Sequence, residues 1–215
     1  HAALQTEDEH GYNVAIGNIA LQTQNAGADA YNVAVGSNSG QAITTGIYNT
    51  LVGGLAGDAL TDADYNVAIG ANALGQNTVG SRSVAVGYGA LTSHNPATAS
   101  DSYNTAVGML AGENVTTGAD NTLIGGLAGD ALTTGGENVV VGYNALHSDT
   151  KGVGSVAIGR NALYYQNLST TTTTYNTAVG ISAGLSITTG NANTIIGGLA
   201  GDALTDADDN VVLGV

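Results

Sequence analysis

The 215-residue chain lacks cysteine, tryptophan and phenylalanine, and it has one proline and one methionine. Without cysteine, no disulfide scaffold can form. No apolar run approaches the roughly 18 residues that a membrane-spanning helix needs. Basic residues are scarce as well. The chain has three (Arg82, Lys151 and Arg160) and 17 acidic residues, so its formal net charge is −14. Such a chain repels nucleic acid and has no basic patch that could release counterions from phosphates.

Charged residues of either sign are also few, at 9% of the chain, whereas glycine occurs 33 times. Much of the surface must therefore consist of Asn, Thr, Ser and Gly, and the core must be thin and built from small side chains. A net charge of this size favours solubility. This composition is typical of proteins that work outside the cell, so we expect an extracellular, cell-surface or virion location, without insertion into a membrane.

A five-residue unit, [Asn/Ser]-[Val/Thr]-x-[aliphatic]-Gly, occurs twelve times. Eight of the eleven intervals between its copies are 17 residues, one is 19 and two are 21. A longer period of 72 residues lies above the first, since the heptapeptide GLAGDAL at Gly54–Leu60 recurs at Gly126–Leu132 and Gly198–Leu204. A period of 17 is too short for helix pairs or propeller blades and indicates a solenoid.

Within each unit, apolar and small residues alternate with a period of two, which is typical of a short strand. We therefore predict an all-β fold, a parallel β-roll or β-solenoid of about twelve 17-residue coils, in which stacking buries what one coil cannot bury alone. We expect the aliphatic pair of each unit to fill the interior of the coil, with Ala and Gly on the opposite side. The core residues predicted in this way are Val14, Ile16, Val33, Val35, Val67, Ile69, Val84, Val86, Val156 and Ile158.

The repeats begin near residue 12, so residues 1–11 are predicted to be a cap or an attachment segment and residues 12–215 a single repeat domain. The two 21-residue intervals lengthen one turn each, at residues 91–102 and 163–174. Long turns of a solenoid project on one side and often bind partners.

The N-V-A-I-G and S-V-A-V-G units resemble the head repeats of trimeric autotransporter adhesins. That resemblance implies left-handed parallel β-rolls that associate as homotrimers. The segment Asn104–Gly108, followed by Ala111-Gly112 and by Thr116–Gly118, also resembles the N-T-A-x-G-x-x-A-x-x-x-x-T-T-G repeat of phage-type tail fibres and bacterial surface proteins. The resemblance covers residues 12–214 and implies an architecture without implying a ligand.

Ten of the twelve units begin with asparagine, and two begin with Ser83 or Ser155. We interpret this column as a structural ladder whose amides hydrogen-bond from coil to coil, with a polar binding face as the alternative. The ladder residues are Asn13, Asn32, Asn49, Asn66, Asn104, Asn121, Asn138, Asn176, Asn193 and Asn210. The glycine that ends each unit is predicted to need a positive φ or a close backbone approach.

Tyrosine precedes the asparagine in the first four units and in two later ones, at Tyr12, Tyr31, Tyr48, Tyr65, Tyr103 and Tyr175. Rings in consecutive coils should stack in one column. Packing between coils, with the hydroxyl in water, is the plain interpretation, and a carbohydrate-binding aromatic strip is the alternative.

Acidic residues cluster in two of the turns. Oxygen ligands at such spacing could hold Ca²⁺, but the equivalent turn of the middle 72-residue repeat, Thr133–Gly136, carries no carboxylate. We therefore expect solvated acids and no cofactor, with calcium as the alternative. The calcium candidates are Asp58, Asp62, Asp64, Asp202, Asp206 and Asp208.

Catalysis has little support, because the four histidines occupy unrelated positions of the repeat and form no metal or triad spacing. We predict a non-enzymatic fibre segment, a surface adhesin or tail-fibre shaft that self-associates and presents loops to a surface glycan or protein receptor. An extracellular filament that polymerises end to end is the structural alternative. A glycan depolymerase represents the enzyme class, although it would need two carboxylates across a cleft.

Overall fold

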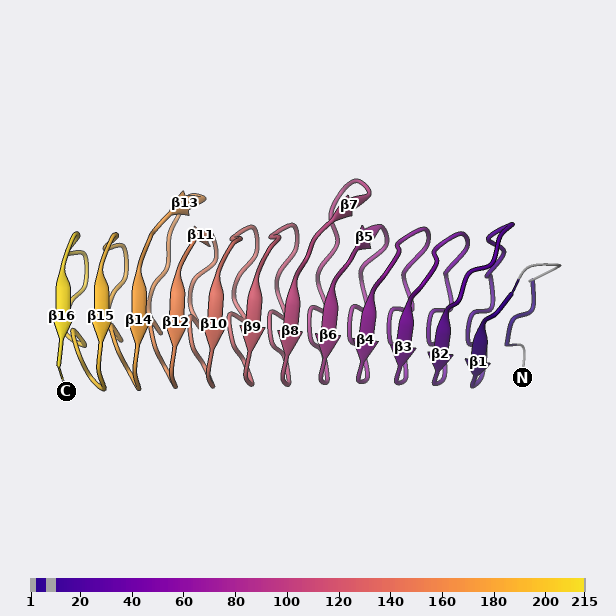
Figure 1. The fold of residues 1–215 in the computed structure, drawn as a ribbon, viewed down its shortest axis with the longest axis horizontal. Helices are drawn as coiled ribbons and strands as arrows, with labels where there is room; N and C mark the ends of the chain where they lie inside the picture. The colour runs from indigo at the N-terminus through magenta and orange to yellow at the C-terminus, as the bar shows by residue number, and fades with distance from the viewer. Residues whose placement is uncertain (1–2, 7–10, 215) are drawn as a thin grey trace. The chain divides into compact units, whose positions relative to one another are not determined.

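The computed structural model describes residues 3–6 and 11–214. Its contacts divide the chain into unit 1, His1–Asn104, and unit 2, Thr105–Val215. The described residues form strands and turns without a helix, and they are wound into twelve coils of a parallel β-solenoid (Figure 1). The prediction of an all-β solenoid with 17-residue coils is therefore confirmed. The predicted segment at residues 1–11 falls largely outside the described residues.

Each coil contributes one three-residue strand, which begins at the second residue of the repeat unit. Unit 1 holds β1 (Val14–Ile16), β2 (Val33–Val35), β3 (Thr50–Val52), β4 (Val67–Ile69) and β6 (Val84–Val86). Unit 2 holds β8 (Thr105–Val107), β9 (Thr122–Ile124), β10 (Val139–Val141), β12 (Val156–Ile158), β14 (Thr177–Val179), β15 (Thr194–Ile196) and β16 (Val211–Leu213). Within each unit these strands pair in parallel and in chain order, so that Val67 lies opposite both Thr50 and Val84.

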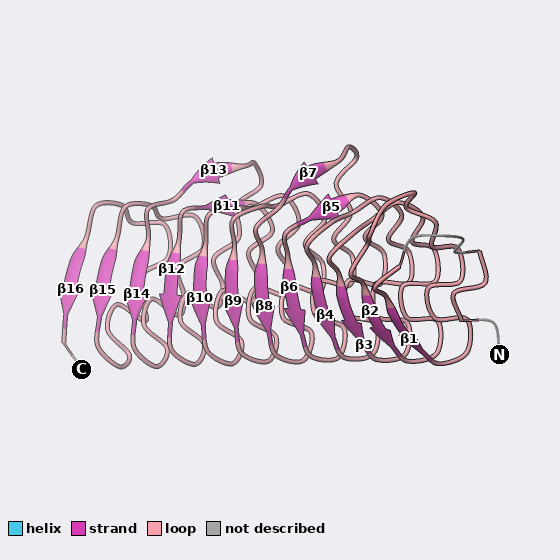
Figure 2. Cartoon of the chain, turned by 45° about the vertical axis from the view of Figure 1, so that its right-hand side comes forward, coloured by secondary structure: helices cyan, strands magenta, loops and turns pink. Residues whose placement is uncertain are grey.

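Each 21-residue interval adds a short pair of strands. In unit 1, β5 (Gly80–Ser81) pairs with β7 (Ser100–Asp101), and in unit 2, β11 (Gly152–Val153) pairs with β13 (Thr172–Thr173). The extra residues therefore project beyond the ordinary turns of their unit and then return along the preceding coil (Figure 2).

The interior of the coil lies on the opposite face of the strands from the one we predicted. The middle residue of the three-residue strands from β2 to β15, such as Ala34 or Leu51, is fully buried, while the residues on either side of it face outward. In β1 and β16 the middle residue is half-buried. Val14, Ile16, Ile69 and Ile158 are 44%, 60%, 39% and 36% exposed. The remaining predicted core residues are half-buried: Val33, Val35, Val67, Val84, Val86 and Val156. The prediction of an interior made of these pairs is therefore wrong.

The asparagines determine which face of the strand turns inward. Each asparagine lies two residues before the middle residue of its strand, so the two side chains point to the same side. From Asn32 to Asn193 the asparagine side chains are buried, while those of Asn13 and Asn210 are half-buried. The side-chain Nδ2 of Asn49 donates to the carbonyl of Ala63 in the same coil at 2.8 Å, and the backbone N–H of Asn49 donates to Oδ1 of Asn32 at 2.8 Å. A buried backbone N–H or carbonyl left without a partner costs about 1–3 kcal/mol. The asparagine side chain must therefore point inward, where it bonds to both.

Two kinds of coil alternate in pairs and explain the 72-residue period. The eighth residue after the asparagine is left-handed throughout, with φ between 47° and 60°, and it is either leucine or glycine. Where it is glycine, the residue three positions later is aliphatic, as in Gly40/Ile43, Gly57/Leu60, Gly112/Val115, Gly129/Leu132, Gly184/Ile187 and Gly201/Leu204. Where it is leucine, that residue is polar, as in Leu21/Gln24, Leu74/Asn77, Leu91/His94, Leu146/Asp149 and Leu163/Gln166.

In the coils with glycine at this eighth position, the glycine leaves room for neighbouring side chains. A Cβ at Gly40 would lie 2.8 Å from Leu51, 2.9 Å from Leu21 and 3.1 Å from Ile43. The core is thus filled by interdigitation along the stack, which suits a chain with few large apolar residues.

Candidate interaction surface

The outward residues of the strands form two columns in each unit, which we call the outer face. Its members are the first and third residues of every three-residue strand, and all of them are Val, Ile, Leu or Thr. Strands repeat about every 4.8 Å, so the seven strands of unit 2 extend for about 29 Å. In unit 2, Val107, Ile124 and Val139 are 37%, 40% and 38% exposed. In unit 2 the third residues form a continuous aliphatic column, whereas four of the seven first residues are threonine. An exposed aliphatic column of this length is unusual on a surface in contact with water and marks an interaction site.

Residues that follow the repeat glycine widen the apolar area at the ends of the strands. Met109, Tyr143 and Ile181 of unit 2 are 55%, 53% and 55% exposed. Arg160 occupies the same position of the repeat and is exposed as well. The outer face of unit 2 is therefore almost free of charge, although the chain carries a net charge of −14.

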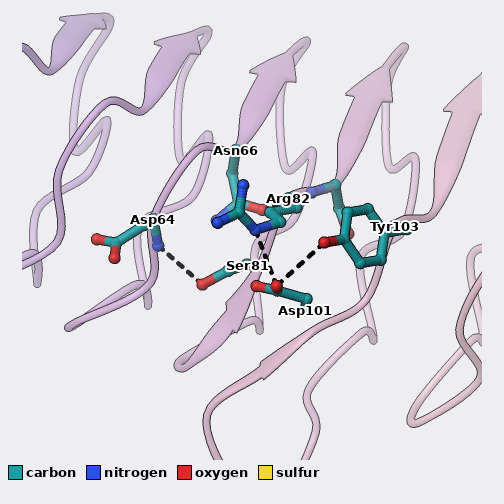
Figure 3. A network of polar contacts seen from close by, with 7 residues as sticks. Asp64, Asn66, Ser81, Arg82, Asp101 and Tyr103 are labelled. Atoms are coloured by element: carbon teal, nitrogen blue, oxygen red, sulfur yellow. Dashed lines mark hydrogen bonds and ion pairs between the residues drawn. The ribbon is translucent and has the colours of Figure 1, made fainter.

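The long loop of unit 1 is fastened by a polar cluster that sequence reasoning missed (Figure 3). The Nε of Arg82 lies 2.9 Å from Oδ2 of Asp101, and the hydroxyl of Tyr103 donates to the same oxygen at 3.1 Å. Farther along the loop, Pro96 lies against Gly80, where an added Cβ would come within 3.0 Å of the proline ring. The two flanks of the exposed tip are thereby held against the coil.

The long loop of unit 2 is fastened from inside the coil instead. Nε2 of the buried Gln166 donates to Oδ2 of the buried Asp149 at 2.6 Å and to Oγ of Ser155 at 2.9 Å, and Oγ of Ser155 lies 2.6 Å from Oγ1 of Thr174. Asp149 also accepts the N–H of Gly152 at 3.0 Å. The sequence held a signal for both loops, since serine replaces the ladder asparagine wherever a 21-residue interval begins.

Tyr12, Tyr31, Tyr48 and Tyr65 form one continuous stack, which we call the tyrosine ladder. Their centroids lie 5.1, 5.3 and 5.2 Å apart, and the ring planes are within 8° of parallel. Partial desolvation in the stack, together with the nearby carboxylate of Asp29, raises the pKa of the Tyr31 hydroxyl. Tyr103 belongs to the loop cluster, and Tyr175 in unit 2 has no tyrosine at this position in the neighbouring coils.

Two of the predicted calcium candidates bridge neighbouring turns. Oδ1 of Asp64 accepts the N–H of Ile47 at 2.8 Å, and Oδ1 of Asp208 accepts the N–H of Asn191 at 2.7 Å. Asp62 and Asp206 accept the hydroxyls of the threonines that precede them.

The other two calcium candidates lie apart from these turns. Asp58 is half-buried, and desolvation raises its pKa, whereas Asp202 is exposed. Among residues 3–6 and 11–214, no group of three or more His, Cys, Asp or Glu side chains could hold a metal ion.

One carboxylate–imidazole pair occurs in unit 2. Nδ1 of His147 lies 2.6 Å from Oδ1 of Asp130, and the imidazole stacks on Tyr164 with centroids 4.8 Å apart. Desolvation raises the pKa of Asp130 although His147 opposes the shift. The contact joins neighbouring coils of unit 2, since His147 follows Asp130 by one 17-residue repeat.

No helix in the described part of the chain is long and apolar enough to cross a membrane. Comparison with family models, with curated proteins and with solved structures found no match for this chain. The outer face, the fastened loops and the tyrosine ladder are the features of the described surface that offer contacts to a partner.

Proposed function

We propose that this chain is a segment of a self-associating adhesive fibre, a surface adhesin or tail-fibre shaft, in which outer faces of neighbouring copies pack lengthwise. The exposed outer face is the observation that carries the proposal. Its valines, isoleucines and leucines face water in a single copy, and a second copy supplies an apolar surface of the same length. The association contributes about 25 cal/mol for each Å² of apolar area removed from water.

The shape of the outer face supports association along its whole length. The aliphatic column of unit 2 is about 29 Å long, and a second copy offers a column of the same length and chemistry. The resemblance to trimeric adhesin heads implies three copies, each of which would bury its strip against two others. The small cross-section of the outer-face side chains suits such a central seam.

The projecting loops and the acidic turns would then remain on the outside of the assembly. Each unit presents one fastened loop, with exposed tips at residues 97–100 and 169–171. Weak contacts of such loops with a surface receptor gain effective concentration when several copies are joined. This multivalent attachment requires no catalytic group.

The test is the mass of the chain in solution, measured by size-exclusion chromatography with light scattering. We expect three times the chain mass of 21.1 kDa. The double variant Ile124→Lys/Ile158→Lys places two cations on the outer face and should be monomeric. The matched control Thr117→Lys/Thr189→Lys adds the same charge at exposed turn positions and should keep the mass of the wild type.

A wild-type chain that stays at 21.1 kDa at the highest soluble concentration would contradict the proposal. Equal loss of association in the control would contradict the role of the outer face. Electron microscopy of the same samples distinguishes discrete fibre segments from filaments many chain lengths long, which would favour end-to-end polymerisation instead.

A further inference from the structure

The tyrosine ladder has an unusual backbone. Its residues have φ of 53°, 52°, 57° and 58°, in the left-handed region that bulky side chains avoid. At the same position of the repeat, unit 2 carries Asp120, Glu137, Gly154, Tyr175, Ala192 and Asp209, five of which are smaller or more flexible than tyrosine. The turn itself therefore does not require an aromatic ring. The left-handed turn belongs to the repeat, since Asp120, Glu137 and Ala192 share it, so the run of four tyrosines is a choice of side chain that the backbone does not demand.

The rings of the ladder are slipped past one another. Carbon atoms in contact lie about 3.5–4.0 Å apart, whereas the centroids of neighbouring parallel rings are 5.1–5.3 Å apart. Each ring is therefore displaced sideways relative to the next, and part of its face is left uncovered. Tyr31, Tyr48 and Tyr65 are 42%, 44% and 44% exposed, and Tyr12 is 71% exposed. The ladder thus presents a row of tilted, half-open aromatic faces, each with a hydroxyl at its tip.

The ladder is held rigid at the end near the long loop. The guanidinium of Arg82 covers the ring of Tyr65 at 4.7 Å from the centroid, and Asp101 fixes the guanidinium by the ion pair described above. Figure 3 shows Asp101 joined to both Arg82 and Tyr103, with the backbone N–H of Asp64 donating to the hydroxyl of Ser81 beside them. Because the stack is ordered before a ligand arrives, binding along it costs little side-chain entropy.

A ligand for this surface must offer flat apolar patches at the interval of the rings, separated by hydroxyls. A β-1,4-linked pyranose chain in its extended form does so, because its sugar rings advance by nearly the same distance as the tyrosines and carry C–H groups on their faces. Asp29, Asp64 and Asp101 in the surrounding turns, together with the net charge of −14, oppose an acidic polysaccharide.

We propose that the tyrosine ladder binds a neutral β-1,4-linked polysaccharide whose chain runs along the stack of rings. This inference names a ligand class for the adhesive fibre proposed above, and its biological role rests on that proposed function. The C–H faces of the sugars lie on the uncovered parts of the rings, and the tyrosine hydroxyls bond to sugar hydroxyls. The polar cluster of Arg82, Asp101 and Tyr103 borders one end of the site.

The test is affinity electrophoresis of the full chain in native gels that contain hydroxyethylcellulose, a soluble neutral β-1,4-glucan. We expect the wild type to be retarded by this polymer and not by dextran, which is α-linked, or by the anionic carboxymethylcellulose. The double variant Tyr31→Leu/Tyr48→Leu keeps apolar bulk but removes two central rings, and its dissociation constant should rise at least tenfold.

The matched control is Tyr165→Leu/Tyr175→Leu, which removes two exposed tyrosines of unit 2 and should bind like the wild type. Equal retardation of both double variants, or no retardation of the wild type by hydroxyethylcellulose, would overturn the inference. Retardation by a cationic polymer such as polylysine, without retardation by the glucan, would also overturn it and point to a basic partner.

If the ladder variant does not fold, near-ultraviolet circular dichroism of the wild type decides the question. With no tryptophan or phenylalanine in the chain, this signal comes from tyrosine. It should change on addition of hydroxyethylcellulose, and an unchanged spectrum would overturn the inference. Light scattering on the same samples keeps the two proposals apart, because a trimer that ignores the glucan refutes the ladder inference alone.

Discussion

Replacing one asparagine of the ladder tests the inward orientation of the coil. In Asn66→Ala, the buried N–H of Ser83 loses its acceptor, Oδ1 of Asn66 at 2.9 Å. An orphaned buried donor costs about 1–3 kcal/mol. The carbonyl of Gly80 loses the Nδ2 donor at 3.0 Å but keeps a bond from Asn77 at 2.8 Å, so this loss adds about 0.5–1.5 kcal/mol. We therefore expect the free energy of unfolding to fall by about 2–4 kcal/mol.

The measurement is urea unfolding followed by far-ultraviolet circular dichroism at one fixed protein concentration, so that self-association is held constant. The matched variant Asn138→Ala, in unit 2, breaks the equivalent bonds to Ser155 and Gly152 and should lose a similar amount. The exposed Asn167, which accepts from Thr150, serves as the control, since Asn167→Ala should cost less than about 0.5 kcal/mol. A ladder variant as stable as this control would refute the reasoning.

Three further changes test the packing and the charges. Gly70→Ala should cost more than about 3 kcal/mol, because its Cβ would clash with the carbonyl oxygen of Gly87 at a φ of 132°. Gly11→Ala, with open space around it, should be neutral in the same urea titration. Leu51→Ala should cost about 2–5 kcal/mol, since Leu51 fills the space beside Gly40 and Gly57, and a loss below about 1 kcal/mol would contradict that packing. Asp58→Asn should raise the melting temperature at pH 7, because desolvation raises the pKa of Asp58 above its ordinary value of 3.8. A raised carboxyl pKa gives stability below the unfolded pKa that is lost as the pH rises through the folded pKa, so the gain of the variant should vanish below about pH 3.8, and a gain that persists there would contradict this sign.

The 17-residue period was enough to predict the strands and their register, because equivalent residues of parallel coils must stack. Val67 indeed lies opposite Val84. Alternation shows that a strand has two faces, but it does not say which face is inside. Apolar size favoured Val67 and Ile69, yet the inward side belongs to Asn66 and Ala68, because the amide of Asn66 must reach the carbonyl of Gly80.

The loop clusters could not be predicted in the same way. The contact of Arg82 with Asp101 joins residues 19 positions apart, and it exists because four added residues fold back to pair β7 with β5. The spacing of the repeats shows where residues are inserted, but it does not show how the inserted residues fold. The tyrosine column was visible in the sequence, whereas its slipped geometry depends on the left-handed backbone at Tyr31 and Tyr48, which no propensity of tyrosine suggests.

Cross-linking through a single introduced cysteine tests most directly whether the outer faces of neighbouring copies meet. The chain has no cysteine of its own, so Ile124→Cys places one thiol on the outer face and Thr117→Cys places one in an exposed turn. With a short bis-maleimide at low protein concentration, the account predicts covalent dimers for Ile124→Cys and mainly monomer for Thr117→Cys. Equal yields from the two variants, or no dimer from Ile124→Cys, would contradict it.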